Sequence, residues 1–356
     1  MRERHKEADS LKILAAIFVV ILHVNGYLSN MFSFEDTPYL SNIIWHFMEA
    51  MAYPAIHIFI MVSAYFLIDA KNPIKGGINA WIQTILISLI GLFLAVIFRV
   101  PFDGKEIFRS VFPFLGRAYW YVSDYILLLF LVPMLNKVID GAEKAFMKYT
   151  VIVLFGLNSI LSTFLAFLDW NQDYSNIGLF ILLYFIVAYL KMNQDILNKT
   201  RGGILWGLNI GCLVMSWLIF DMLSQKGISI VVGREMFLYQ YCSPFVIMEA
   251  VGIFICFFAK ETYYKSRLLK TLSSASLAVY LIHMHPVFKV HYVEWGIFRW
   301  INIANPIAYL AQMAGVVVVV FMVGTVVSIP MTMLSTKATN IIVNNFACKH
   351  WEKNNV

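Results

Sequence analysis

Ten long apolar segments, separated by short polar connections, follow one another along the chain. An α-helix rises about 1.5 Å per residue, so about 20 apolar residues cross the roughly 30 Å hydrocarbon core of a membrane. The pattern therefore predicts an all-α integral membrane protein, a bundle of about ten transmembrane helices in a single membrane-embedded domain over residues 1–356. The expected spans lie near residues 11–30, 43–68, 78–98, 119–138, 148–168, 176–191, 203–223, 237–259, 272–291 and 306–334.

Three of these segments depart from the length of one straight span. The second and tenth are long and the sixth is short, so tilted or kinked helices are expected there. Pro54 lies within the second segment and Pro133 within the fourth. Because proline lacks an amide hydrogen and clashes with the preceding turn, these two positions are the expected kink sites.

The composition agrees with the membrane interpretation, since 60% of the 356 residues are hydrophobic and only 13% are charged. A soluble domain is about one quarter charged. The net charge of +6 does not indicate a nucleic-acid partner, because the basic residues sit in short loops where membrane topology explains them. The four cysteines have no paired spacing, so neither a disulfide framework nor a zinc site is expected. No cleavable signal peptide is expected, since the first apolar run has no small-residue cleavage site.

Lysine and arginine in the loops predict the orientation. Most of them fall on the same side as the N-terminus, so both termini are assigned to the cytoplasm and the chain to the cytoplasmic (inner) membrane. The 99–118 loop is the exception, because it places four basic residues on the outer side. Either Asp103 and Glu106 offset these charges, or the loop meets an anionic substrate.

A histidine interrupts the first apolar segment. His23 follows Lys12 by eleven residues, about 16 Å along a helix, which is about half the hydrocarbon thickness. Ionisable groups at such depth are costly and face polar cavities or partners, so His23 is a candidate functional residue. The structural alternative is a histidine bonded to a neighbouring helix.

Further titratable residues are expected at a similar depth, in the second, eighth and ninth segments. They are His46, Glu49, His57, Glu249, His283 and His285. A histidine-lined polar cavity would support proton transfer, since histidine titrates near neutrality and a carboxylate can orient it. Glu49 has a structural alternative as a partner for His46, which shares its helix face.

The boundary of the fourth segment combines aromatic residues with an acid. Three aromatics at residues 119–121 are typical of the interfacial belt, and Asp124 near a helix N-terminus is favoured electrostatically in any case. No metal-binding spacing, nucleophile elbow or phosphate-binding glycine loop is present. The residues alone therefore support a membrane enzyme or transporter with a polar cavity.

Several motifs narrow this choice. Asp9 to Lys12, leading to His23, is similar to an Arg-x10-His signature on a first helix. The stretch IFIMVSAYFLI at residues 58–68 is similar to F-x-x-x-S-G-Y-F-L, and YWYVSDYILLLFLVPMLNKVI at 119–139 is similar to W-Y-x-x-x-Y-x-x-L-x-x-x-x-P-x-L-N. With these motifs in this order, the chain resembles the acyltransferase 3 family of polytopic membrane acyltransferases, in particular the branch associated with bacterial surface polysaccharides.

Two further stretches carry the same resemblance. LSSASLAVYLIHMHPVF at residues 272–288 is similar to L-S-x-x-S-x-x-x-Y-L-I-H, and GLFILLYFIVAYLK at 178–191 adds support. Two positions depart from the family pattern. Lys12 replaces the signature arginine and loses the bidentate fork that suits phosphate. Ala64 replaces the glycine after the serine and is expected to thicken a close helix contact.

The resemblance implies acyl transfer across the bilayer. Acyl-CoA, most often acetyl-CoA, would be the cytoplasmic donor, and a sugar hydroxyl of an extracytoplasmic polysaccharide or glycan precursor would be the acceptor. His23 would be the general base or acyl-handling residue, and Lys12 would attract the coenzyme A phosphates. A hydrogen-bond donor for the carbonyl oxygen is also required, and Tyr121, Tyr280, Ser63 and His283 remain open for that role.

The other expected site residues and partners follow from the same resemblance. Glu49 is a further candidate for catalysis, and Trp120 and Asp124 for substrate binding. Membrane lipid, the acyl-CoA donor and a glycan are the expected partners, without nucleic acid and without a metal, and the sequence leaves homo-oligomer formation open.

Two other functions compete with the enzyme hypothesis. A transporter or flippase of a lipid-linked saccharide would move its substrate without covalent change, but paired broken helices in corresponding halves are not apparent. A non-catalytic partner in a glycan-assembly complex would bind glycan lipid without depending on His23.

Overall fold

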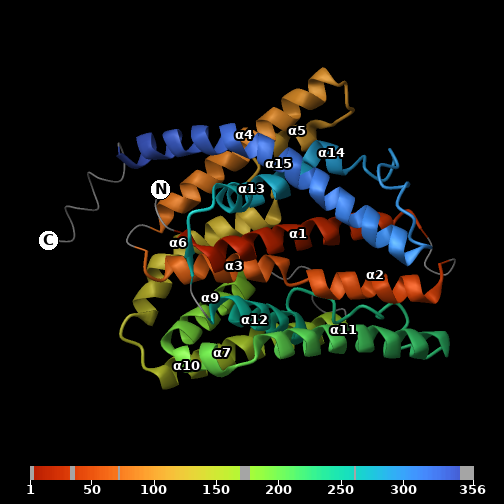
Figure 1. The fold of residues 1–356 in the computed structure, drawn as a ribbon, viewed down its shortest axis with the longest axis horizontal. Coiled ribbons are helices and arrows are strands. Elements are labelled where there is room, and N and C mark those ends of the chain that lie inside the picture. The colour runs from red at the N-terminus through yellow and green to blue at the C-terminus, as the bar shows by residue number, and fades with distance from the viewer. Residues whose placement is uncertain (1–3, 33–36, 71–72, 169–176, 260–261, 345–356) are drawn as a thin grey trace.

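The computed structural model describes residues 4–32, 37–70, 73–168, 177–259 and 262–344 (Figure 1). Over these residues the chain is almost entirely helical, with one short antiparallel ribbon. Its first half contains β1 (Arg4–His5), α1 (Lys6–Leu28), α2 (Tyr39–Ala52), α3 (Ala55–Leu67), α4 (Ile74–Ile97), α5 (Gly104–Val111), α6 (Trp120–Ile139), α7 (Lys144–Phe155), a π-helical turn (Gly156–Leu161) and α8 (Ser162–Phe167). Its second half contains α9 (Ile177–Met192), α10 (Gln194–Lys199), α11 (Gly202–Gln225), α12 (Pro244–Phe258), β2 (Tyr263–Tyr264), α13 (Arg267–His283), α14 (Pro286–Lys289) and α15 (Pro306–Ile342).

Each of the ten expected segments overlaps a helix in the described ranges, but the eighth, expected at 237–259, is helical only from Pro244. Seven helical stretches are long and apolar enough to cross a membrane, at residues 6–28, 39–67, 74–97, 120–139, 144–167, 202–225 and 306–342. The other three are shorter: α9 has 16 residues, α12 has 15 and α13 has 17. The all-α, multi-pass membrane class is confirmed, while the count of about ten spans stays a prediction.

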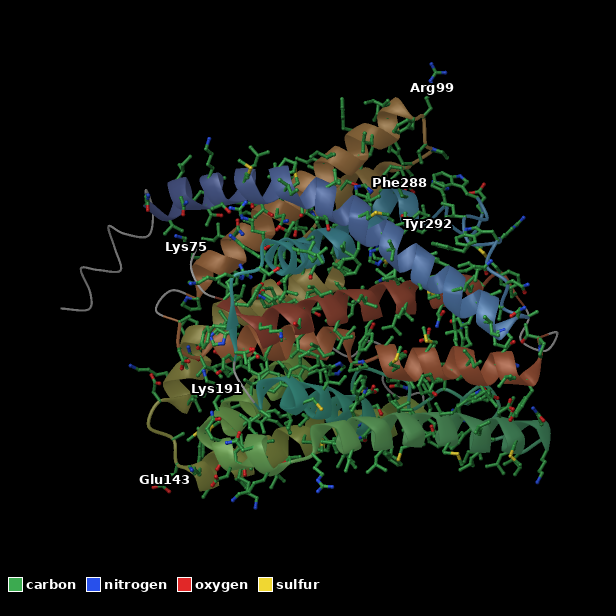
Figure 2. The ribbon with its side chains drawn as sticks, viewed as in Figure 1. Lys75, Arg99, Glu143, Lys191, Phe288 and Tyr292 are labelled. Atoms are coloured by element: carbon green, nitrogen blue, oxygen red, sulfur yellow. The ribbon has the colours of Figure 1, made fainter. Side chains whose placement is uncertain are left out.

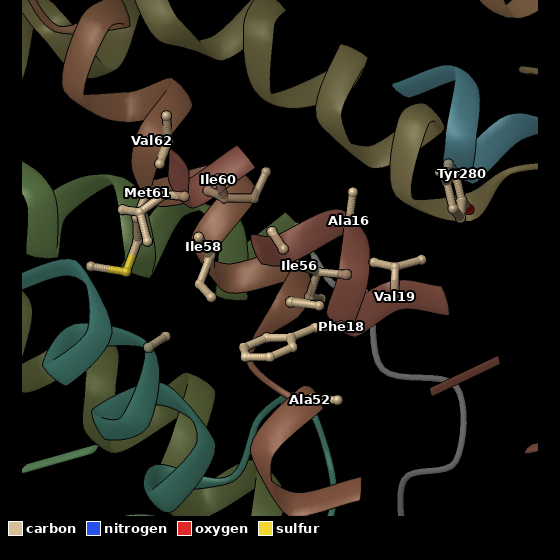
Figure 3. Packing of buried hydrophobic residues seen from close by; sticks show 14 of the residues in the cluster. Ala16, Phe18, Val19, Ala52, Ile56, Ile58, Ile60, Met61, Val62 and Tyr280 are labelled. Carbon is tan, nitrogen blue, oxygen red and sulfur yellow. The ribbon is translucent and has the colours of Figure 1, made fainter. Parts of the chain in front are cut away.

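The first helix lies at the centre of the bundle. α1 packs against α2, α3 and α13, and Figure 1 shows it between α13 and α15 on one side and α3 and α12 on the other. Phe18 and Val19 of α1 lie beside Ile56 of α3 in the main core (Figure 3). Ala64 of α3 is fully buried, so the methyl group that replaces the family's glycine is accommodated.

Proline divides the second segment. α2 ends at Ala52 and α3 begins at Ala55, directly after Pro54, so the expected break occurs there. Pro133 instead lies inside α6, which continues through it.

The described helices begin and end at two opposite ends of the molecule. The start of α1 and the end of α15 lie together in Figure 1, and Lys75 and Lys191 mark the same end in Figure 2. Arg99 and Tyr292 mark the opposite end (Figure 2). The pattern agrees with the predicted relative direction of the helices, and the cytoplasmic assignment stays a prediction. Cys212, Cys242 and Cys256 are free, and Cys348 lies outside the described residues.

Helices α11 and α12 approach each other closely at two glycines, Gly202 and Gly252. A methyl group added at Gly252 of α12 would lie 2.8 Å from the backbone nitrogen of Trp206 and 2.9 Å from the carbonyl oxygen of Gly202. Small residues allow this kind of backbone contact within a membrane bundle. Gly207 of α11 has no such neighbour within 4 Å.

Candidate active site

A cavity of about 270 Å³ follows α1 through the centre of the bundle. Its wall comes from β1, α1, α3, α4, α6, α13 and the connection before α12. The residues that line it are Arg4, Lys12, Val19, Leu22, His23, Ile56, Phe59, Ser63, Ala80, Trp120, Tyr121, Val122, Tyr125, Tyr241, Ser273, Ser274, Ser276, Leu277 and Tyr280. Six of the nine predicted site residues therefore share one cavity: Lys12, His23, Ser63, Trp120, Tyr121 and Tyr280.

His23 and His283 lie in contact at the end of this cavity that is farther from Arg4. The Nδ1 atom of His23 lies 2.8 Å from Nε2 of His283, and Nδ1 of His283 lies 2.5 Å from the carbonyl oxygen of Val279. A carbonyl oxygen only accepts, so Nδ1 of His283 carries the hydrogen and, in the neutral ring, Nε2 accepts from His23. This assignment leaves the lone pair of His23 on Nε2, on the histidine that lines the cavity.

A lysine lies on the same helix, nearer its N-terminus. The Lys12 side chain is partly buried, and its ammonium group makes no hydrogen bond or ion pair with the residues that the structure describes. The carboxylate of the neighbouring Asp9 already has hydrogen-bond partners, because Arg4 donates to both of its oxygens at 2.7 and 2.6 Å. Tyr264 and Ser273 each donate a further bond of 2.6 Å to Asp9. The Lys12 ammonium group is therefore left facing the cavity.

The short ribbon explains why Asp9 has these partners. β1 pairs antiparallel with β2, with Arg4 opposite Tyr264. Glu7 closes the connection, since its carboxylate accepts from the backbone nitrogen of Thr262 at 2.8 Å. The bond to Asp9 raises the pKa of Arg4, and burial together with the Asp9 bond raises the pKa of Tyr264 to about 12.

Aromatic side chains close the cavity around His23. The Tyr280 ring stacks on His23 with a centroid distance of 6.2 Å. Tyr121 and Tyr119 approach Tyr280 at 6.0 and 5.9 Å, and Trp120 contacts Tyr241 at 5.4 Å. The site thus combines an imidazole lone pair, several hydroxyl donors and an apolar enclosure.

Three predicted residues lie outside the cavity wall. His283 stands behind His23, as described above. Asp124 accepts from the Arg117 guanidinium at 3.2 Å. Glu49 is buried beside Asn25, whose side-chain oxygen accepts a 2.7 Å bond from Tyr309.

The other titratable groups do not join the pair. His57 donates to the carbonyl oxygen of Tyr241 at 2.7 Å, and His285 to that of Ser88 at 2.9 Å. Glu249 accepts from the Trp206 ring nitrogen at 3.0 Å, and His46 stacks on Trp217. These side chains therefore have separate partners, although the sequence places them at a similar depth in different helices. Among the described residues, His23 is the only histidine in the cavity wall.

Arg4 and Tyr241 also line the cavity, but neither was among the site residues predicted from the sequence. Arg4 lies before the first apolar segment, and Tyr241 lies in the connection between α11 and α12, so no helical periodicity marks either of them. Within the described ranges, no group of three or more His, Cys, Asp or Glu side chains is placed to hold a metal ion.

Comparison with known proteins confirms the resemblance in the sequence. The profile of the acyltransferase 3 family, described as an acyltransferase domain, matches residues 5–331. No curated protein and no solved structure shows significant similarity to the chain. The matched range runs from the ribbon that holds Arg4 through the cavity and both histidines into α15. The chain therefore belongs to the acyltransferase 3 family of membrane acyltransferases.

Proposed function

We propose that this protein is a bacterial inner-membrane O-acyltransferase with both termini in the cytoplasm. It takes an acyl group, most simply acetyl, from cytoplasmic acyl-CoA and transfers it to a sugar hydroxyl of an extracytoplasmic polysaccharide or glycan precursor. One observation carries the proposal: a single cavity contains the Lys12 ammonium group and, about 16 Å further along α1, the His23 imidazole. The first suits the anionic donor, and the second suits proton removal from an alcohol.

His23 is the proposed general base. Its Nε2 lone pair accepts the proton of the sugar hydroxyl while that oxygen attacks the thioester carbonyl carbon. The new C–O bond forms, the C–S bond breaks, and the proton passes from His23 to the departing thiolate. The products are the sugar ester and free coenzyme A.

His283 is the proposed positioning residue for this step. Because its own Nδ1 hydrogen is directed to Val279, its Nε2 accepts the Nδ1 hydrogen of His23. This bond fixes the tautomer and the ring orientation of His23 and becomes charge-assisted when His23 takes up the proton.

The carbonyl oxygen gains negative charge during the attack and needs a donor. Tyr280, Tyr121 and Ser63 present hydroxyl groups on the cavity wall near His23, and Trp120 completes the enclosure. Glu49 and Asp124 lie outside this wall, so we assign them a supporting role in helix packing rather than contact with substrate.

Lys12 is proposed to bind the phosphates of the donor. A lysine ammonium recognises phosphate as a point charge, whereas an arginine at this position would offer a planar fork. The bidentate pairing of Arg4 with Asp9 supports this role, because Asp9 is hydrogen-bonded to Arg4 rather than to Lys12.

The test is the O-acetyl content of surface glycans in cells that lack the protein and carry either the wild type or His23→Ala. At equal membrane abundance, the wild type should restore the ester and His23→Ala should not. Equal restoration by both would refute the role of His23. If deletion changes the amount of glycan at the surface but not its acetylation, the transporter hypothesis is favoured instead.

A further inference from the structure

The loop between α4 and α6 contacts the segment that follows the histidine pair in sequence. Its helix, α5, packs against α4 and α14. The ring of His291 donates from Nε2 to the carbonyl oxygen of Pro101 at 2.8 Å, which joins this loop to the segment after α14. Arg99, Phe288 and Tyr292 accordingly appear at the same end of the molecule (Figure 2).

The acidic residues of this loop cap its helix and form no ion pair with a basic side chain of the described loop. Asp103 accepts from the backbone nitrogens of Lys105 and Glu106 at 2.8 and 3.0 Å, and Glu106 accepts from the backbone nitrogen of Asp103 at 2.7 Å. This capping box uses both carboxylates to begin α5. Arg117 is paired with Asp124 of α6 instead.

Two cations of this region have no carboxylate partner. Arg109 of α5 and Lys289 of α14 are both partly buried, and the two helices that carry them pack against each other. Neither makes an ion pair with any part of the chain that the structure describes. Lys289 ends α14, which begins three residues after His283, the partner of His23. Partly buried like charges repel, so an anion bound between these two side chains would stabilise them.

An aromatic group lies beside the same region. Tyr27 follows His23 by one helical turn, about 6 Å along α1. Its ring stacks on Phe298 at 5.7 Å and meets Tyr292 edge-on at 5.2 Å. Aromatic rings with polar tips provide flat apolar surfaces with hydrogen-bonding groups at their edges, which suit a sugar ring.

We propose that Arg109 and Lys289 form an acceptor subsite for an anionic group, so that the acceptor is an acidic glycan carrying carboxylate or phosphate. The proposal rests on the proposed function, since it names the substrate class for transfer at His23. The charged group of the glycan would lie between the two cations, and a neighbouring sugar would lie along the aromatic group of Tyr27, Tyr292 and Phe298. A hydroxyl one sugar away would then reach His23.

Binding to the purified full-length protein in neutral detergent tests this subsite. Three probes are compared: tetragalacturonic acid supplies carboxylates, pyrophosphate supplies phosphate without sugar, and maltotetraose is neutral. Wild type should bind at least one anionic probe about tenfold or more tightly than maltotetraose. Preference for tetragalacturonic acid indicates carboxylate as the anion. Preference for pyrophosphate indicates phosphate at this subsite if Lys12→Gln keeps it, and phosphate at the donor site, against the proposal, if Lys12→Gln removes it.

Matched variants locate the effect. Arg109→Gln with Lys289→Gln should abolish the preference for the anionic probe. Lys105→Gln, one turn earlier on the same helix, should keep it, because the Lys105 side chain is exposed whereas Arg109 and Lys289 are partly buried. Lys289→Arg preserves the charge and should retain binding, which keeps the test valid if the glutamine variants fold poorly. Equal binding of charged and neutral probes by wild type, or equal loss with Lys105→Gln, would overturn the proposal. His23→Ala should bind all probes as wild type does, so loss of acyl transfer and loss of the subsite are separable.

Discussion

Replacement of His283 tests the orientation of the catalytic histidine. His283→Phe keeps an aromatic ring of similar size but removes the acceptor that lies 2.8 Å from Nδ1 of His23. His283→Gln keeps an acceptor oxygen and an amide hydrogen that can still be directed to Val279. The two variants therefore separate the loss of volume from the loss of the hydrogen bond.

The expected magnitude follows from the charge that His23 acquires. Once it takes up the hydroxyl proton, the bond from its Nδ1 to His283 joins a charged donor to a neutral acceptor, and such bonds contribute about 1.5–3 kcal/mol. At 1.36 kcal/mol for each factor of ten, His283→Phe should lower kcat about 10- to 150-fold. His283→Gln should stay within about tenfold of wild type.

The assay is acetyl transfer by the purified protein in liposomes, with kcat and KM for acetyl-CoA measured separately. Because His283 does not line the cavity, KM should change little in either variant. If His283→Phe has wild-type kcat, or if both variants lose activity equally at equal unfolding temperature, the tautomer argument is wrong.

Three other perturbations have defined outcomes. Gly252→Ala should destabilise the protein by about 1–3 kcal/mol, because its methyl group meets the backbone of Trp206, whereas Gly207→Ala should not; thermal unfolding in detergent measures both. The interactions of the Tyr264 hydroxyl stabilise the folded protein fully at pH values below about 10, the pKa of tyrosine in the unfolded chain. This stabilisation is lost as the pH rises through the pKa of Tyr264 in the folded protein, which is about 12. Unfolding temperatures between pH 9 and 12 should therefore fall less steeply in Tyr264→Phe than in wild type, and identical slopes would contradict this. Lys12→Gln should raise KM for acetyl-CoA about tenfold with little change for acetyl-pantetheine, which lacks the phosphates, while Lys12→Arg should not.

The helical class and the location of the helices could be predicted from apolar length alone. The break at Pro54 was also predictable, since proline removes a backbone donor. Whether the short helices α9, α12 and α13 cross the membrane could not be derived, because that depends on the surrounding bundle and lipid rather than on their own length.

The site was predictable where residues share a helix and a face. Lys12 and His23 are fixed relative to one another by α1, and both line the cavity. The pairing of His23 with His283 depends on how α1 rotates against α13, which periodicity does not specify. For the same reason, the sequence did not indicate that His57, His285 and Glu249 make hydrogen bonds to separate partners, although they lie at similar depths.

The hydrogen bonds around Asp9 could not be predicted from the sequence for a different reason. Asp9 and Arg4 are near neighbours in sequence, but Tyr264 and Ser273 reach Asp9 only through the ribbon that pairs β1 with β2. Two-residue strands have no periodic signal, so the arrangement that leaves Lys12 facing the cavity became visible only in three dimensions.

The most direct test of the central claim is transfer of a labelled acetyl group from acetyl-CoA by the purified protein in liposomes. Wild type and His23→Ala are compared at equal incorporation, with ester formed on an added glycan as the readout. The account predicts that wild type forms the ester and releases one free thiol for each ester, and that His23→Ala falls by at least about 100-fold. Equal ester formation by both proteins would contradict catalysis through His23.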